Sequence, residues 1–138
     1  MSHQGYPRQL RLLTAGDYRR VFETAAFKIH GKGLMALASP NGCGHPRLGL
    51  IFSKKNVRNA VDRNRLKRIV RESIRLQQHR LPSVDIVVLA RRGVHELDNA
   101  TVHRQLHGMW RRLAREANRP AHETDLPVAE SGGVDRAQ

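Results

Sequence analysis

The residues best suited to chemistry form one basic run in the middle of the chain, Arg63-Asn64-Arg65-Leu66-Lys67-Arg68, which Arg71 extends. Each arginine presents a planar fork of donors that matches two phosphate oxygens. On successive helical turns such forks could follow a phosphate backbone, and each neutralised phosphate would release counterions. A solvated helix face usually mixes both signs of charge, but only Asp62 and Glu72 balance this one. We therefore interpret the run as a nucleic-acid contact, and the pattern alone does not separate RNA from DNA.

The charge of the whole chain supports this interpretation. Its 138 residues contain 25 Lys and Arg against 12 Asp and Glu, for a formal net charge of +13. Residues 54–80 alone hold ten basic and two acidic residues, and a polyanionic partner is the usual reason for such an excess. Residues 120–138 instead hold four acids and one base. We expect one basic domain over residues 1–119, followed by an acidic, disordered tail over 120–138.

Other kinds of chemistry find little support. The single cysteine, Cys43, excludes an internal disulfide and a cysteine-based zinc cluster, and it fits a reducing cytoplasmic compartment. No apolar run approaches the ~18 residues of a membrane span. His103 and His107 have the i, i+4 spacing of zinc ligands, but no third ligand accompanies them. Because the acidic residues are also scattered, we expect neither a metal site nor catalytic residues in the chain itself.

The elements that must position the basic run follow from turn signals and apolar spacing. Thr14 and Asp17 predict a capping box that begins a short helix. Strands are expected at 34–38 and 48–52, paired as a hairpin, and a central strand at 84–90. The basic run belongs to a helix whose opposite side is an apolar stripe of Leu66, Ile69, Val70 and Ile74.

A last helix, capped by Asp98 or Asn99, should end before Pro120 and bury an apolar face. The expected order is α-β-β-α-β-α, an α+β fold in which helices pack on a small sheet as a two-layer sandwich. The segment 48–90 is long enough for a parallel strand-helix-strand crossover.

The first helix carries Tyr18 and Phe22 one turn apart. Two rings on one side of a helix could stack unpaired bases. They could also be core residues that cover the sheet, and the residues alone slightly favour that role.

A longer pattern resembles the signature of the bacterial ribonuclease P protein subunit. It is carried by Phe52-Ser53-Lys54-Lys55-Asn56-Val57-Arg58-Asn59-Ala60 and by the basic run extended through Arg71-Glu72-Ser73. Further similarity lies in His45-Pro46-Arg47-Leu48-Gly49-Leu50 and Asp17-Tyr18-Arg19-Arg20-Val21-Phe22. The resemblance covers residues 8 to about 118. It implies a left-handed β-α-β crossover, against the usual right-handed rule.

The resemblance implies a non-catalytic subunit that helps a catalytic RNA remove the 5′ leader of precursor tRNA and broadens its substrate range. The RNA would hold the active site and its Mg²⁺. The side chains expected on the RNA subunit are Lys54, Arg63, Asn64, Arg65, Lys67, Arg68 and Arg71. Those expected to line a cleft for the leader are Tyr18, Phe22, Ser53 and Lys55. A general basic RNA-binding or ribosome-associated protein and a DNA-binding protein are the alternatives.

Overall fold

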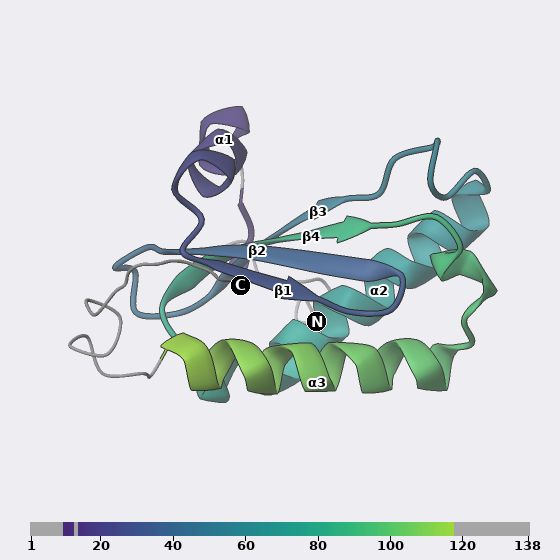
Figure 1. Cartoon of the computed structure of the whole chain (residues 1–138). Coiled ribbons are helices and arrows are strands. Elements are labelled where there is room, and N and C mark those ends of the chain that lie inside the picture. Colours follow the sequence, from purple (N-terminus) through teal and green to yellow (C-terminus); the bar gives the residue numbers. More distant parts are fainter. Residues whose placement is uncertain (1–9, 13, 118–138) are drawn as a thin grey trace, which may run out of the picture.

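The computed structural model describes residues 10–12 and 14–117, and Figure 1 shows how the chain is arranged. The expected acidic tail, 120–138, lies outside these residues. The helices are α1 (Ala15–Thr24), α2 (Ala60–Gln77) and α3 (Asn99–Ala117). The strands are β1 (Phe27–His30), β2 (Leu34–Pro40), β3 (Arg47–Ile51) and β4 (Val84–Ala90). The α+β class and the three expected helices are confirmed, and β1 is an additional strand.

The four strands form one sheet in the order β1-β2-β4-β3. β2 is antiparallel to both β1 and β4, whereas β3 is parallel to β4. The expected hairpin between 34–38 and 48–52 is therefore wrong. The hairpin partner of β2 is instead β1, a strand of only four residues that was missed although its polar Lys28 and His30 alternate with apolar residues. Gly33, with φ +79°, allows the tight turn between β1 and β2.

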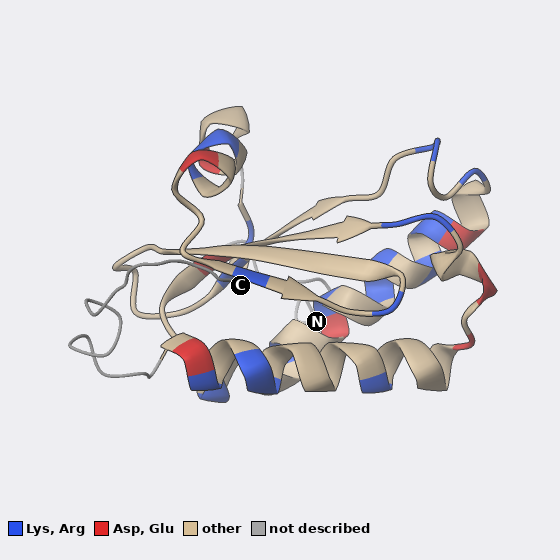
Figure 2. Ribbon diagram, in the orientation of Figure 1, with Lys and Arg blue, Asp and Glu red and all other residues tan. Residues whose placement is uncertain are grey.

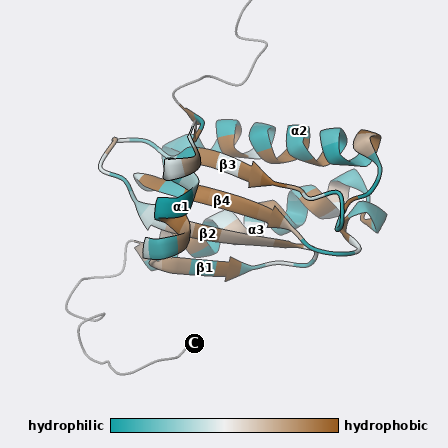
Figure 3. Cartoon of the chain, turned by 90° about the horizontal axis from the view of Figure 1, so that it is seen from above, coloured by the Kyte–Doolittle hydropathy of each residue, from teal (hydrophilic) through white to brown (hydrophobic). Residues whose placement is uncertain are grey.

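Helices α2 and α3 cover one face of the sheet, and α1 lies on the other face (Figure 1). The main core lies between the sheet and α2–α3, where Leu66, Ile86 and Leu106 are fully buried. A smaller cluster under α1 contains Val21, Leu37 and Val87. Seen from above, β3, α2 and β4 form a left-handed parallel crossover (Figure 3). The crossover implied by the resemblance is therefore confirmed.

Local hydrogen bonds explain where the helices begin. Thr14 and Asp17 form the predicted capping box at the start of α1. Asn59 caps α2, because its side chain accepts a hydrogen bond from the amide of Val61. Asp98 caps α3, because its side chain accepts a hydrogen bond from the amide of Thr101. Trp110 then joins α3 to α2 through a bond from Nε1 to Ser73 Oγ of 2.7 Å. Of the helices in the described ranges, none combines the length and hydropathy of a membrane span.

Candidate nucleic-acid interface

The predicted basic run lies on α2 and divides between two roles. Asn64, Arg68 and Arg71 are exposed on the outer side of the helix, and Lys67 beside them is half-buried. Nothing among the described residues hydrogen-bonds or ion-pairs with these four side chains. Leu66, on the opposite side, is fully buried against the sheet. Figure 2 shows how basic residues gather along α2 and the loop before it. We call Asn64, Lys67, Arg68 and Arg71 the α2 stripe.

Arg63 and Arg65 instead contact the protein itself. Arg63 Nη1 donates to the carbonyl oxygens of Val57 and Arg58, at 2.9 and 3.0 Å. Arg65 donates to Asn99 Oδ1 at 2.6 Å and to the carbonyl oxygen of His95 at 3.3 Å. Their guanidinium groups therefore hold the loop before α2 and the turn before α3. Their expected contact with RNA stays a prediction.

The β3–α2 loop carries Ser53, Lys54 and Lys55, all exposed. Ser53 shapes the loop, because its carbonyl oxygen accepts from Val57 N at 2.9 Å and its Oγ accepts from Asn56 N at 3.2 Å. The loop rises on the same side of the sheet as α1 but at the opposite end (Figure 1). Ser53 and Lys55 therefore belong to a different element from the aromatic residues of α1, of which Tyr18 contacts β3 at Gly49 and Leu50.

A hollow of about 680 Å³ lies between this loop and the turn after β4. Lys55 and Arg58 line it from one side, and Arg92 and His95 from the other. Asp62 and Glu96 also line the hollow, so its charge is mixed. Sequence reasoning missed Arg92 and His95. The signal was available in the basic pair Arg91-Arg92, which directly follows the strand expected at 84–90.

The structure separates the two aromatic residues of α1 from its core residue. Val21 is completely buried, whereas Phe22 is 46% exposed. Tyr18 is half-buried over β3, and its Oη accepts from the amide of Leu50 at 3.2 Å. The ring of Tyr18 lies so close to Gly49 that a Cβ there would be 2.7 Å from it. Phe22 is therefore the aromatic side chain of α1 most available for stacking.

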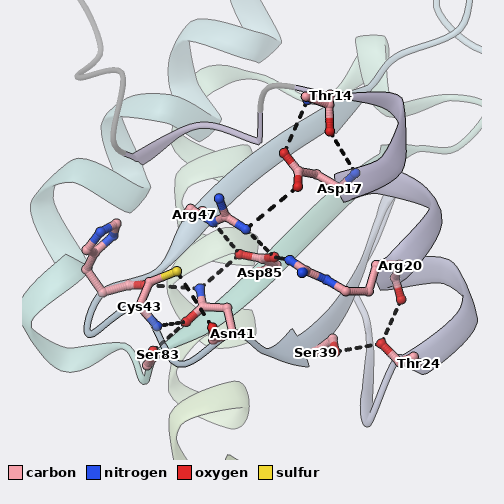
Figure 4. Close-up of polar contacts among 11 residues, drawn as sticks. Thr14, Asp17, Arg20, Thr24, Ser39, Asn41, Cys43, Arg47, Ser83 and Asp85 are labelled. Carbon is pink, nitrogen blue, oxygen red and sulfur yellow. Dashed lines mark hydrogen bonds and ion pairs between the residues drawn. The ribbon is translucent and has the colours of Figure 1, made fainter.

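A buried carboxylate fastens α1 to the sheet (Figure 4). Asp85 on β4 is 1% exposed and accepts two bonds from Arg47, at 2.7 and 2.8 Å. It also accepts from Arg20 at 2.5 Å and from Asn41 at 2.9 Å. Burial by itself would raise the pKa of Asp85, but the bonds from Arg47, Asn41 and Arg20 together lower it below its ordinary value. Sequence reasoning missed this site, although Asp85 is the single acid in an apolar strand.

No group of three or more His, Cys, Asp or Glu side chains in the described residues could hold a metal ion. His103 and His107 therefore have no third ligand among them.

Comparison with known proteins separates the possible nucleic-acid partners. A family model described as ribonuclease P matches residues 6–114. The chain belongs to the ribonuclease P protein family. It is therefore an RNA-binding subunit of a ribonucleoprotein that processes tRNA, and the general RNA-binding and DNA-binding alternatives are set aside.

Individual relatives agree with this assignment to the ribonuclease P protein family. The chain is 71% identical over 119 residues to the ribonuclease P protein component of Chromohalobacter salexigens, covering 86% of this chain and 93% of that one. It is 46% identical over 132 residues to that of Pseudomonas aeruginosa, covering 96% and 98%. The Thermotoga maritima RNase P protein, solved with 1-(4-fluorophenyl)-2-thiourea, superposes with a TM-score of 0.67 at 31% identity. That match covers 74% of this chain and 98% of the other.

Proposed function

We propose that this ribonuclease P protein grips the catalytic RNA with α2 and the 5′ leader of precursor tRNA with α1 and the β3–α2 loop. The observation that carries the proposal is the presence of two chemically different surfaces on separate elements. The α2 stripe offers cations that form no hydrogen bond or ion pair with any residue the structure describes, which suits a folded RNA backbone. Phe22 on α1 offers an exposed ring, which suits unpaired bases.

The α2 stripe binds phosphates of the RNA subunit through Lys67, Arg68 and Arg71, with Asn64 beside them. Lys54 extends this contact into the loop before the helix. Arg63 and Arg65 contribute first by fixing that loop and the turn before α3, and they present their remaining donors to RNA at the same place. Their backbone and Asn99 bonds support this division of roles.

The leader lies across the α1 side of the sheet. Phe22 and Tyr18 receive bases at one end, and Ser53 and Lys55 contact the strand at the other. Three half-buried side chains between these ends, Met35, Ile51 and Leu89, give the leader an apolar floor. An extended single strand is the form of RNA that such a surface accommodates.

In this proposal the RNA subunit hydrolyses the phosphodiester bond and holds the Mg²⁺ ions. The protein raises substrate affinity, broadens the range of substrates and works in the cytoplasm. Support comes from the chemistry of the described side chains, which is cationic on α2 and in the β3–α2 loop and aromatic on α1. The buried carboxylate of Asp85 accepts hydrogen bonds from Arg20, Asn41 and Arg47.

Reconstitution tests the proposal. The full chain is mixed with the ribonuclease P RNA subunit and precursor tRNA at low Mg²⁺, and leader release is followed. We expect the protein to increase cleavage, and we expect no cleavage from the protein without RNA. Unchanged cleavage on addition of the protein would overturn the assisting role. Leader release by the protein alone would overturn the assignment of catalysis to the RNA.

A further inference from the structure

A small pocket lies where the two proposed surfaces meet, beside the edge strand β3. It has a volume of about 170 Å³ and opens to solvent between α1 and α2. Tyr18 forms one wall, Leu48 and Leu50 form the floor, and Lys67 and Arg71 stand at the α2 side. We call this hollow the edge pocket. It joins Tyr18, expected on the leader, to two members of the α2 stripe, expected on the RNA subunit.

The floor and wall of the edge pocket are apolar and firmly placed. Leu48 is 4% exposed, and the amide of Leu12 donates to its carbonyl oxygen at 3.0 Å, which covers the start of the β3 edge. The ring of Tyr18 rests on Gly49, and its Oη is held by the amide of Leu50. The aromatic wall is therefore already in position before any ligand arrives, which lowers the entropy cost of binding.

The α2 side of the pocket is cationic. Lys67 and Arg71 are one helical turn apart, and no described residue forms a hydrogen bond or ion pair with either side chain. None of the described residues lining the pocket is acidic. This distinguishes the edge pocket from the larger hollow near Lys55, where Asp62 and Glu96 offset the basic residues. An anion is thus favoured at one side of the edge pocket, and a flat apolar group at the other.

We propose that the edge pocket binds a single nucleotide of an RNA strand, with its base on Tyr18 and Leu50 and its phosphate on Lys67 and Arg71. The pocket, of about 170 Å³, has room for one aromatic ring, because an enclosed apolar cavity of about 150 Å³ accommodates a benzene ring, and the second ring of a purine would lie outside it. A pyrimidine therefore fits better than a purine. The inference rests on the proposed RNA-binding function and deepens it. The nucleotide belongs either to the leader or to an unpaired position of the RNA subunit.

Titration of the isolated full chain tests the pocket directly. Uridine 5′-monophosphate should shift the amide resonances of Leu12, Leu48 and Leu50, whereas uridine and inorganic phosphate should shift them far less. Adenosine 5′-monophosphate should bind more weakly than the uridine nucleotide. Equal shifts with inorganic phosphate, or shifts confined to other parts of the protein, would overturn the proposal.

Matched variants separate the pocket from general charge and aromaticity. Arg71→Gln should weaken the binding of uridine 5′-monophosphate by about tenfold, since a hydrogen bond to a charged phosphate is lost. Arg68→Gln removes the same charge from the same helix outside the pocket and should have a much smaller effect. Tyr18→Leu should weaken nucleotide binding by about fivefold or more, whereas Phe22→Leu should leave nucleotide binding unchanged. Equal losses within either pair would refute a discrete pocket.

The source of the nucleotide is found in the reconstituted holoenzyme by placing single abasic nucleotides in the leader or in the RNA subunit. The nucleotide in the pocket is the one whose abasic replacement weakens assembly with the wild-type protein but causes no further weakening with the Tyr18→Leu variant. Coupling to a leader position assigns the leader, and coupling to an RNA-subunit position assigns that RNA. If neither strand shows coupling, the inference fails. The proposed function fails separately, if wild-type protein gives no gain in cleavage.

Discussion

Arg20 on α1 and Asp85 on β4 are 65 residues apart in the chain and meet at 2.5 Å, Nη2 to Oδ2. Asp85 is completely enclosed, whereas the side chain of Arg20 is 49% exposed. The same carboxylate binds Arg47 on β3 through two bonds and Asn41 on the β2–β3 loop through one. One buried charge therefore sets where α1 sits on the sheet, and with it the position of Phe22.

The first prediction concerns the stability that this carboxylate provides. Asp85→Asn should lower the free energy of unfolding by about 3 kcal/mol, because the partly buried Arg47 loses the carboxylate that accepts two of its bonds and keeps only Asp17 among the described residues, at 3.9 Å. Urea denaturation of the full chain measures the change. Glu23→Gln, an exposed acid on α1, is the matched control and should change stability by less than about 0.5 kcal/mol. Equal effects of the two substitutions would contradict a structural role for Asp85.

The second prediction concerns pH. Because the pKa of Asp85 is lowered on folding, the folded state binds fewer protons than the unfolded state at mildly acidic pH. Its contribution is complete above about pH 4, the ordinary range of an aspartate, and is lost as the pH falls through the folded pKa. Hydrogen bonds from Thr101 also lower the pKa of Asp98, which adds to the slope in the same direction. Asp85→Asn should flatten the acid limb of stability against pH without abolishing it.

The sequence predicts the helices and their buried sides well, but it does not predict which distant segments contact one another. The buried and exposed sides of α2, around Leu66 and Arg68, could be predicted, because the spacing of apolar residues indicates which side of a helix is buried. The pairing of β2 with β1 was missed because β1 has only four residues, too few for its alternation of apolar and polar residues to stand out. Asp85 was visible as an acid in an apolar strand, but its partners come from three distant segments. Tertiary contacts of that kind leave no local pattern.

The same reasoning applies to the basic run. Sequence placed Arg63, Arg65, Arg68 and Arg71 together as equivalent phosphate contacts. In the structure, Arg63 donates to the carbonyl oxygen of Val57 in the loop before α2. Arg65 donates to Asn99 Oδ1 and to the carbonyl oxygen of His95, near the start of α3. A guanidinium on a helix has several directions available, and the packing of neighbouring loops decides among them.

The third prediction uses this difference. Arg68→Ala should lower the slope of log binding constant against log salt by about 0.7–0.9 for the RNA subunit, since one phosphate contact is lost. Protein stability should be nearly unchanged. Arg63→Ala should instead lower the free energy of unfolding by about 1–3 kcal/mol, because two backbone carbonyl groups lose their donor. Filter binding over a salt series and urea denaturation measure the two quantities, and an unchanged slope for Arg68→Ala would remove it from the RNA contact.

The fourth prediction concerns the leader. Phe22→Ala should weaken binding of leader-bearing tRNA by about 1–3 kcal/mol and leave mature tRNA nearly unaffected, because a stacked base is lost. Val21→Ala, the neighbouring buried residue, should lower stability instead without favouring one tRNA over the other. Binding of both tRNAs to the reconstituted holoenzyme makes the comparison. Equal losses on the two tRNAs for Phe22→Ala would place the ring outside the leader path.

The last prediction concerns the contact between Tyr18 and Gly49. A Cβ on residue 49 would lie 2.7 Å from the Tyr18 ring, so Gly49→Ala should displace the ring and lower stability by about 1–3 kcal/mol. Removing the ring removes the clash, and Gly49→Ala should therefore cost much less in a Tyr18→Ala background. A double-mutant cycle of urea denaturation measures this coupling. Additive effects would show that Gly49 is needed for a reason other than Tyr18, and the positioning of the aromatic wall would then depend on the Leu50 amide alone.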